Sequence, residues 1–216
     1  MSLVTQPHAN TSSSSNPSGS HDTETSQIPP TPLKTQTSST GFVFPAIWSF
    51  PPFFTLQPNP TTQAHQLTLW TTLILDWARH DRVFSVNCDA LDAGQVFRNK
   101  IIDRRLLPNA MREVMSSMTK NGYAAPDPPK QTAMYLLYWR KPDEWATLIH
   151  DWITANGFNA SIMTFYEITD GDLSESTEFR QLPEPMLRKA LESLVKRGKA
   201  QMLRGEGEAG EGVRFL

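Results

Sequence analysis

Residues 70–77 read WTTLILDW and residues 145–152 read WATLIHDW, so the chain contains nearly the same eight residues twice, 75 positions apart. A second pair follows at the same offset, because Leu107-Pro108 in the first half corresponds to Leu182-Pro183 in the second. A repeat of this length is too long for one turn of a solenoid, but it suits a small autonomous domain. The sequence therefore predicts two related domains in tandem.

The first copy has the periodicities of a mixed α and β unit. Large apolar residues recur at helical spacing from Leu67 to Trp77 and again from Met111 to Met118. Asp89 is a suitable N-cap for a short helix between them, and β-type runs lie on either side. The predicted elements are a helix around residues 67–77, a strand at 83–86, a short helix at 89–99, a helix from Pro108 to Gly122, and strands at 123–125 and 133–140.

The second copy repeats this order. The predicted elements are a helix that starts at Pro142, a strand at 162–168, a short helix in the acidic stretch that follows, a last helix up to Gly198, and a hairpin of residues 200–203 and 213–216 around the glycine-rich turn 205–212. Three helices followed by a β-hairpin is the layout of a winged-helix domain. We predict an α+β fold with winged-helix domains at residues 61–140 and 141–216. The alternative, two unrelated small α+β domains, is weakened by the shared offsets.

Residues 1–41 have a different composition. They are mostly Ser, Thr, Pro, Gln and Asn, with hardly any large apolar residue to offset the entropy of ordering. We predict that this stretch is a disordered tail. It lacks the basic start and apolar centre of a signal peptide, and its few basic residues argue against a transit peptide.

Residues 42–60 combine aromatic residues with prolines and lie outside either repeat. Prolines pre-set an extended backbone, which lowers the entropic cost of docking into a groove on a partner. Burial of Phe53 and Phe54 in pockets of a partner would be enough for a hot spot of such a contact. The alternative is that part of this segment, such as Phe44 and Trp48, covers the chain's own first domain.

Composition and charge limit the possible classes of protein. No apolar stretch approaches the roughly 18 residues that span a bilayer. Cys88 is the only cysteine, which excludes an internal disulfide and favours a reducing compartment such as the cytosol. A net charge of −2 provides no overall attraction for nucleic acid or for an anionic membrane.

No set of side chains has the spacing of a catalytic or metal site. The five histidines are scattered, and none pairs with Cys88 at catalytic spacing, so we expect this cysteine to be a packing residue. The acidic residues from Asp170 to Glu178 lack the ordered ligand spacing of a calcium loop. We therefore expect a protein with no enzymatic activity, no metal and no cofactor.

A tandem winged-helix protein that binds nucleic acid is the alternative function. The third helix of such domains enters the major groove, and the last helix of this chain carries Arg188, Lys189 and Lys196. However, Glu184 and Glu192 share that helix, and three more glutamates fill the adjacent hairpin turn. These carboxylates largely cancel the potential that a phosphate backbone would meet, so we expect no nucleic-acid partner.

Several motifs resemble the vacuolar protein sorting 25 family of ESCRT-II subunits. They are residues 50–59, FPPFFTLQPN; residues 138–145, YWRKPDEW; residues 164–171, TFYEITDG; and residues 212–216, GVRFL. The resemblance covers the chain after the tail, and the order and spacing of the motifs agree with the family. The long tail is extra, and Ala46 stands where an aromatic residue is expected.

This resemblance implies a non-enzymatic scaffold in endosomal sorting of ubiquitinated cargo into multivesicular bodies. Two copies of the subunit join one copy each of the larger ESCRT-II subunits, vacuolar sorting proteins 22 and 36. The motif of Pro51, Pro52, Phe53 and Phe54 would insert into those partners, with Trp48 and Phe50 as further candidate contacts. The second winged helix would recruit the ESCRT-III subunit vacuolar sorting protein 20. The expected location is the cytoplasm, with recruitment to endosomal membranes through indirect contact.

Overall fold

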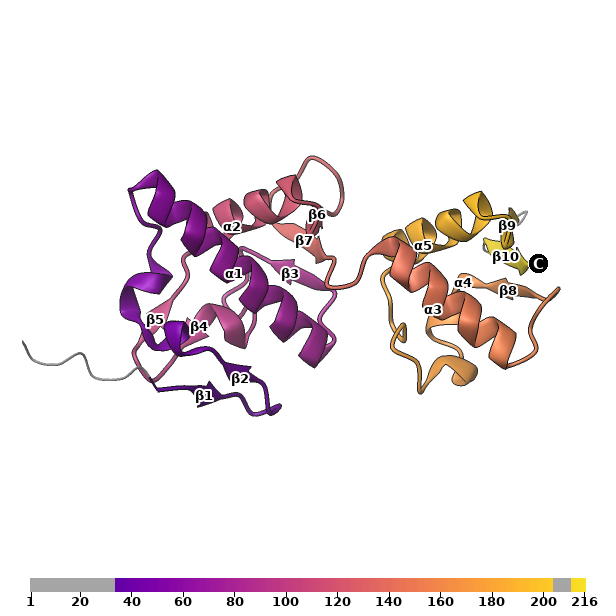
Figure 1. Cartoon of the computed structure of the whole chain (residues 1–216), viewed down its shortest axis with the longest axis horizontal. Coiled ribbons are helices and arrows are strands. Elements are labelled where there is room, and N and C mark those ends of the chain that lie inside the picture. Colours follow the sequence, from indigo (N-terminus) through magenta and orange to yellow (C-terminus); the bar gives the residue numbers. More distant parts are fainter. Residues whose placement is uncertain (1–33, 204–210) are drawn as a thin grey trace, which may run out of the picture. The chain divides into compact units, whose positions relative to one another are not determined.

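The computed structural model describes residues 34–203 and 211–216, and two similar α+β units follow one another in this part of the chain (Figure 1). Figure 1 shows in each unit a long helix and a second helix packed with a small sheet. The first unit contains α1 (Pro60–Asp81), β3 (Ser85–Asn87), α2 (Pro108–Lys120), β6 (Ala124–Pro126) and β7 (Met134–Leu137). The second contains α3 (Pro142–Ala155), β8 (Ile162–Thr164), α4 (Phe165–Thr169), a 3-10 turn η4 (Asp172–Ser174), α5 (Glu184–Lys196), β9 (Ala200–Leu203) and β10 (Gly212–Phe215).

The two sheets have the same topology. The strand order is β3-β7-β6 in the first unit and β8-β10-β9 in the second, with every pair antiparallel. In both units the strand after the first helix is an edge strand, and it pairs with the last strand of the C-terminal hairpin. This correspondence confirms the predicted α+β fold of two related units.

Local sequence signals account for most helix boundaries. The Asn59 side chain accepts hydrogen bonds from the backbone N–H groups of Thr61 and Thr62, which caps α1, and Pro60 occupies its first position. The helices α2 and α5 are each followed by a glycine with positive φ, Gly122 at 77° and Gly198 at 67°. Glycine reaches this left-handed conformation without a steric cost, so both helices end where the sequence predicts.

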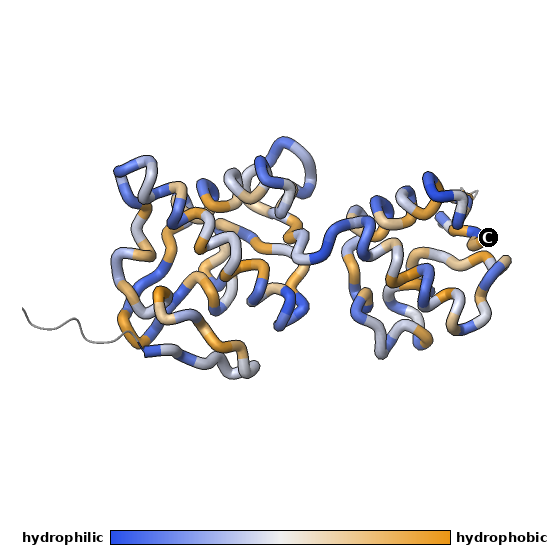
Figure 2. The backbone as a smooth tube through the Cα atoms, viewed as in Figure 1, coloured by the Kyte–Doolittle hydropathy of each residue, from blue (hydrophilic) through white to orange (hydrophobic). Residues whose placement is uncertain are grey.

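Each unit has its own hydrophobic core. Trp70 of α1 and Trp145 of α3 are both fully buried, and the apolar faces of α2 and α5 pack in the corresponding cores. The second tryptophan of the repeat differs, because Trp77 is buried whereas Trp152 is only partly buried, against Phe158 and Phe179. Figure 2 shows apolar stretches in both units and a polar connection from β7 to α3.

The predicted short helix at residues 89–99 is wrong. The structure has a 3-10 turn η3 (Gln95–Phe97) followed by a two-stranded hairpin, β4 (Arg98–Asn99) and β5 (Arg104–Arg105). Asp89 does not cap a helix; its backbone N–H instead donates to the side chain of Asn87. Gly94 has a φ of 128° and a ψ of 153°, which interrupts any helix at this point.

The predicted strand at residues 162–168 is too long. It ends at Thr164, whose hydroxyl accepts a hydrogen bond from the Glu167 backbone while the Glu167 carboxylate accepts one from the Thr164 backbone. This reciprocal capping box starts α4 directly after the strand. The Thr164 backbone N–H that bonds to Glu167 also holds the pKa of that carboxyl below its usual value.

The folded part of the N-terminal region begins before the predicted boundary at residue 42. Residues 34–41, assigned above to the tail, include β1 (Gln36–Thr37), which pairs with β2 (Val43–Phe44). The segment after β2 is not extended but forms two 3-10 turns, η1 (Ala46–Ser49) and η2 (Pro51–Phe54). The rest of the predicted tail and most of the turn at 205–212 lie outside the described residues.

We predict that Gly94→Ala destabilises the first unit. The φ and ψ of Gly94 belong to a region open almost only to glycine, and a Cβ here would lie 2.5 Å from the Trp77 ring. The backbone strain and the overpacking together should lower the free energy of unfolding by about 2 to 4 kcal/mol. Chemical denaturation of the full chain measures this change.

Gly122→Ala is the matched control, since this glycine also has positive φ but an added Cβ would meet nothing within 4 Å. Its cost should be limited to backbone strain of about 1 kcal/mol. Equal destabilisation by the two substitutions would show that the Trp77 contact does not constrain Gly94.

Candidate partner-docking surfaces

The segment that contains the predicted docking motif is folded onto α1. The Phe53 ring stacks on Trp70 with 4.4 Å between centroids and 6° between planes, and Phe54 meets the same indole edge-on at 5.5 Å. Upstream, Phe44 stacks on Trp48 at 3.7 Å. All five rings belong to the core of the first unit.

Two side chains of α1 hold the backbone of this segment. The Gln66 amide nitrogen donates to the carbonyls of Phe53 (2.8 Å) and Thr55 (2.9 Å), and its oxygen accepts from the Gln57 backbone at 3.1 Å. The Trp70 indole N–H donates to the Phe53 carbonyl at 3.1 Å. Because Gln66 is buried and both ends of its amide are hydrogen-bonded, the backbone from Phe53 to Gln57 is held in one conformation.

The opposite side of the segment is held by the stretch where a helix was predicted. The Trp48 indole N–H donates to the Val96 carbonyl at 2.7 Å, and the Asn99 side chain donates to the Trp48 carbonyl at 3.0 Å. Asn99 is fully buried, and its oxygen accepts from the Ile101 backbone at 3.0 Å. Because residues 95–99 do not form the predicted helix, Val96 and Asn99 are free to form buried hydrogen bonds with Trp48.

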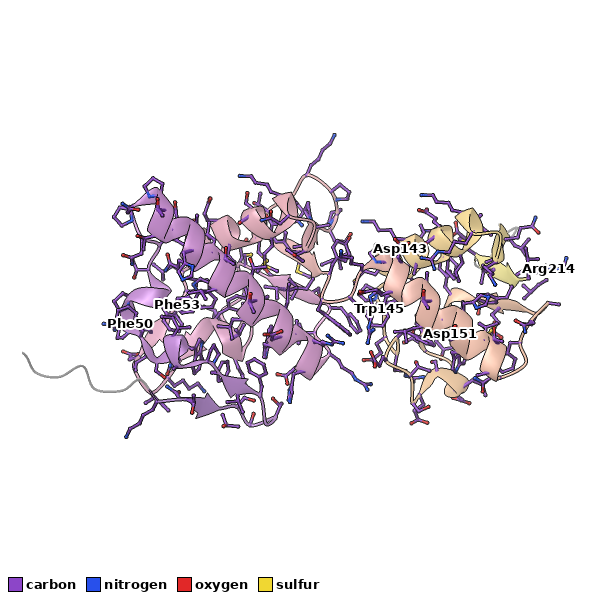
Figure 3. The ribbon with its side chains drawn as sticks, in the orientation of Figure 1. Phe50, Phe53, Asp143, Trp145, Asp151 and Arg214 are labelled. Carbon is purple, nitrogen blue, oxygen red and sulfur yellow. The ribbon has the colours of Figure 1, made fainter. Side chains whose placement is uncertain are left out.

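The six predicted partner-binding residues divide into a buried set and an exposed set. Trp48, Phe53 and Phe54 are at most 5% exposed, because their rings pack in the core of the first unit. The exposed members are Phe50, which is 42% exposed, Pro51 and Pro52. We call these three residues the proline corner. Figure 3 places Phe50 at the outer edge of the segment and Phe53 nearer to α1.

Arginines lie beside the proline corner, and the sequence reasoning missed them. Strand β5, Arg104–Arg105, packs against η2, and both side chains are exposed. Arg98 lies directly opposite Arg105 in the hairpin, an arrangement of like charges that is unfavourable without an anion nearby. The run RNKIIDRR at residues 98–105 carried this signal in the sequence.

A second exposed surface lies on the second unit around α4. Tyr166 is 69% exposed, and open hollows of about 360 Å³ and 530 Å³ flank it, both bounded by Phe165 and by Glu184 at the start of α5. The Arg188 guanidinium covers the Phe165 ring at 5.2 Å. We call this surface the α4 groove.

The cations of α5 are largely engaged within the chain. Arg188 forms ion pairs with Glu184 and with Glu211, and the Glu184 hydrogen bond raises the pKa of Arg188. Arg197 pairs with Asp143 at 3.2 Å, and the Lys189 ammonium donates to the Tyr138 hydroxyl at 2.7 Å. These contacts leave little positive potential for a phosphate backbone at the last helix, where a winged helix would meet the major groove.

The described residues contain no cluster of metal ligands and no activated thiol. In residues 34–203 and 211–216, no three His, Cys, Asp or Glu side chains gather as they would around a metal ion. Cys88 is buried, and burial raises its thiol pKa to about 11, so the reactive thiolate is scarce at neutral pH. Over the same part of the chain, no helix has the length and apolarity that crossing a bilayer requires.

Comparison with known proteins relates this chain to one family. A family model described as an ESCRT-II complex subunit matches residues 47–183. Vacuolar protein-sorting-associated protein 25 of Xenopus laevis is 37% identical over 163 residues, which cover 76% of this chain and 93% of the frog protein. The Homo sapiens protein of the same name is 34% identical over 175 residues, or 81% and 98% of the two chains.

Solved structures agree with the sequence relatives. The crystal structure of subunit VPS25 of the endosomal trafficking complex ESCRT-II superposes with a TM-score of 0.70 at 29% identity, over 79% of this chain and 98% of that one. A chain of the endosomal complex ESCRT-II (VPS22/VPS25/VPS36) superposes with a TM-score of 0.68, over 83% and 100%. The chain therefore belongs to the vacuolar protein-sorting-associated protein 25 family of ESCRT-II complex subunits.

Proposed function

We propose that the chain is a non-enzymatic scaffold subunit of ESCRT-II that sorts ubiquitinated cargo into multivesicular bodies. The observation that carries this proposal is an exposed proline corner fixed on a folded domain, in a chain whose relatives include a subunit solved in a VPS22/VPS25/VPS36 complex. The partners in this proposal are the larger subunits, vacuolar sorting proteins 22 and 36, with two copies of this chain per complex.

The proline corner is suited to docking because its conformation is set before the partner arrives. Phe53 and Phe54 are buried immediately after it, and Gln66 binds the backbone on its C-terminal side. The backbone of this corner would lose little conformational entropy on binding. Most of the free energy gained by burying Phe50, Pro51 and Pro52 would therefore add to the affinity. Arg104 and Arg105 are exposed next to η2 and would favour a partner surface that carries carboxylates.

The second unit recruits vacuolar sorting protein 20, an ESCRT-III subunit, in the same proposal. The subunit acts in the cytoplasm and is brought to endosomal membranes through its partners, with indirect membrane contact. The division of charge between the units supports separate partners, because the exposed hairpin of the first unit is basic whereas the corresponding stretch of the second is acidic.

Truncation of the proline corner tests the docking role. We expect the triple substitution Phe50→Ala, Pro51→Ala and Pro52→Ala to leave the thermal melt of the isolated chain within a few degrees, because these side chains are exposed. Copurification with vacuolar sorting proteins 22 and 36 should be lost, since a buried aromatic anchor typically contributes about 2 kcal/mol or more. Full retention of the complex would contradict the role of this corner.

Phe53→Ala and Phe54→Ala should instead destabilise the chain itself. Each ring is 3% exposed and packs on Trp70, so each truncation should cost about 3 to 5 kcal/mol of unfolding free energy. Denaturant titration of the isolated chain, without partners, measures this cost. An unchanged midpoint would mean that the rings are free in solution and that the segment folds only on its partner.

The arginines beside η2 provide an electrostatic test. Arg104→Glu with Arg105→Glu should weaken capture of the larger subunits about tenfold or more and reduce its dependence on salt. Lys100→Glu is the control, an exposed charge in the turn of the same hairpin and outside β5. If Lys100→Glu weakens the complex as much as the β5 pair does, the effect is one of overall charge and not of position.

A further inference from the structure

We infer that the first unit contacts an anionic phospholipid membrane directly, through the β4–β5 hairpin and the turn before η3. We call this surface the hairpin face and define it by Leu91, Arg98, Lys100 and Ile101, which line one open hollow of about 570 Å³. The inference goes beyond the proposed function, in which the chain reaches endosomes only through its partners. It is carried by the charge of this face, by its two projecting aliphatic side chains and by the walls of the hollow.

The charge of the β4–β5 hairpin is strongly positive. Residues 98–105 contain four cations and one carboxylate, Asp103. Arg98 and Lys100 are exposed, and neither forms an ion pair with any described residue. Among the described residues that line the hollow, Asp92 is the only carboxylate. Salt limits the field of an exposed charge to about 8 Å at physiological ionic strength, so this local excess, and not the net charge of −2, acts on an approaching surface.

Two aliphatic side chains project beside these cations. Leu91 is 89% exposed and Ile101 is 78% exposed, the highest values among the large apolar side chains of the described residues. The buried Asn99 side chain accepts hydrogen bonds from the backbone N–H groups of Ile101 (3.0 Å) and Ile102 (3.3 Å), which fixes the turn of the hairpin. Ile102 packs against the core and Ile101 faces solvent. Transfer of these exposed side chains into the apolar layer of a bilayer is therefore favourable.

Cations next to projecting aliphatic side chains are the chemistry of a peripheral membrane contact. Lys and Arg are attracted to anionic headgroups, while apolar side chains enter the boundary between headgroups and acyl chains. The walls of the hollow suit a headgroup, because the β1–β2 hairpin supplies the polar side chains of Gln36, Ser38 and Ser39 (Figure 1). The stacked Phe44 and Trp48 rings form its floor.

An acidic protein or a nucleic acid fits the hairpin face less well. Hot spots of protein interfaces are rich in Trp, Tyr and Arg, whereas Leu is under-represented among them. Single-stranded nucleic acids stack their bases on accessible aromatic rings. The two aromatic residues that line the hollow, Phe44 and Trp48, are at most 5% exposed. The exposed apolar groups of this face are aliphatic, which favours a bilayer.

Flotation of the isolated full chain with lipid vesicles tests the inference. We expect binding to vesicles of phosphatidylcholine and phosphatidylserine to exceed binding to phosphatidylcholine alone about tenfold or more, and to weaken at high salt. Arg98→Ala with Lys100→Ala should lower the partition coefficient about tenfold or more. Leu91→Ser with Ile101→Ser should lower it by a similar factor without a change in charge. Because all four side chains are exposed, thermal melts of the variants should match that of the unmodified chain.

One substitution should strengthen binding, and two controls should leave it unchanged. Asp92→Asn removes the carboxylate of the hollow and should raise the partition coefficient about twofold or more. Lys196→Ala with Lys199→Ala removes two exposed cations from the end of α5 and the residues after it. Leu173→Ser removes an aliphatic side chain that is 61% exposed in the turn η4. Each control should bind within twofold of the unmodified chain.

A fluorescent label at position 101 supplies a second readout. Cys88 is the only cysteine, and it is buried with a raised thiol pKa, so Ile101→Cys can be labelled selectively with an environment-sensitive fluorophore. Its emission should shift to the blue on anionic vesicles, because the label enters the apolar layer. The same label on Leu173→Cys should show no shift.

The outcomes separate the membrane contact from the proposed scaffold role. No binding, or equal binding to neutral and anionic vesicles, would overturn the inference. Binding that survives the Leu91 and Ile101 substitutions, or a label at position 101 that stays in water, would overturn it as well and assign the face to an acidic protein or a nucleic acid. Capture of the larger subunits is measured without vesicles and is independent of these results. Lys100→Glu, expected above to leave that capture intact, should reduce vesicle binding.

Discussion

The stacking of Phe53 on Trp70 is the interaction on which the first unit depends. It covers the central tryptophan of α1, brings the Phe53 carbonyl within reach of both Gln66 and the Trp70 indole, and leaves the preceding residues facing outward. An aromatic pair at this distance contributes about 0.5 to 1.5 kcal/mol beyond the area it buries. The same contact therefore completes a core and presents the proline corner in one conformation.

The second unit also covers the central tryptophan of its long helix, but with different residues. Trp145 is the counterpart of Trp70, and it is covered by residues from the end of the first unit: Trp139 edge-on at 4.9 Å, and Arg140 with its guanidinium 5.4 Å from the ring centre. Trp139 in turn stacks on Phe84 at 5.4 Å. In both copies, residues that precede the long helix cover the tryptophan of that helix, and in the second copy they come from the end of the first unit.

The copies diverge most between the first strand and the last helix. In the first unit this stretch is a basic hairpin whose Asn99 supports Trp48, and in the second it is α4 followed by an acidic turn. The helices and sheets that bury apolar residues remain alike, whereas the exposed connections differ in charge and in conformation. Surface segments tolerate such change at little cost to stability, so the two units share a core design and differ in the surfaces they expose.

Much of this protein follows from its sequence alone. The 75-residue offset, the helical apolar spacing and the proline and glycine signals near the helix ends were enough to predict two α+β units, the start of α3 and the ends of α2 and α5. These features act through local geometry. The family resemblance likewise rested on local motifs. Two local predictions failed: Asp89 does not cap a helix, and the strand that ends at Thr164 gives way to α4. Both depend on hydrogen bonds of single side chains, which periodicity does not reveal.

Only the tertiary structure decided which aromatic residues of the N-terminal segment are buried and which are exposed. Phe50 and Phe53 are three positions apart in one aromatic and proline-rich segment, and composition treats them alike. The 3-10 turn η2 directs Phe53 and Phe54 onto Trp70 and leaves Phe50 with Pro51 and Pro52 at the surface. The sequence determined that this segment is rich in aromatic residues and prolines. Which of its rings enter the chain's own core is decided by long-range packing, which depends on side chains far away in the sequence.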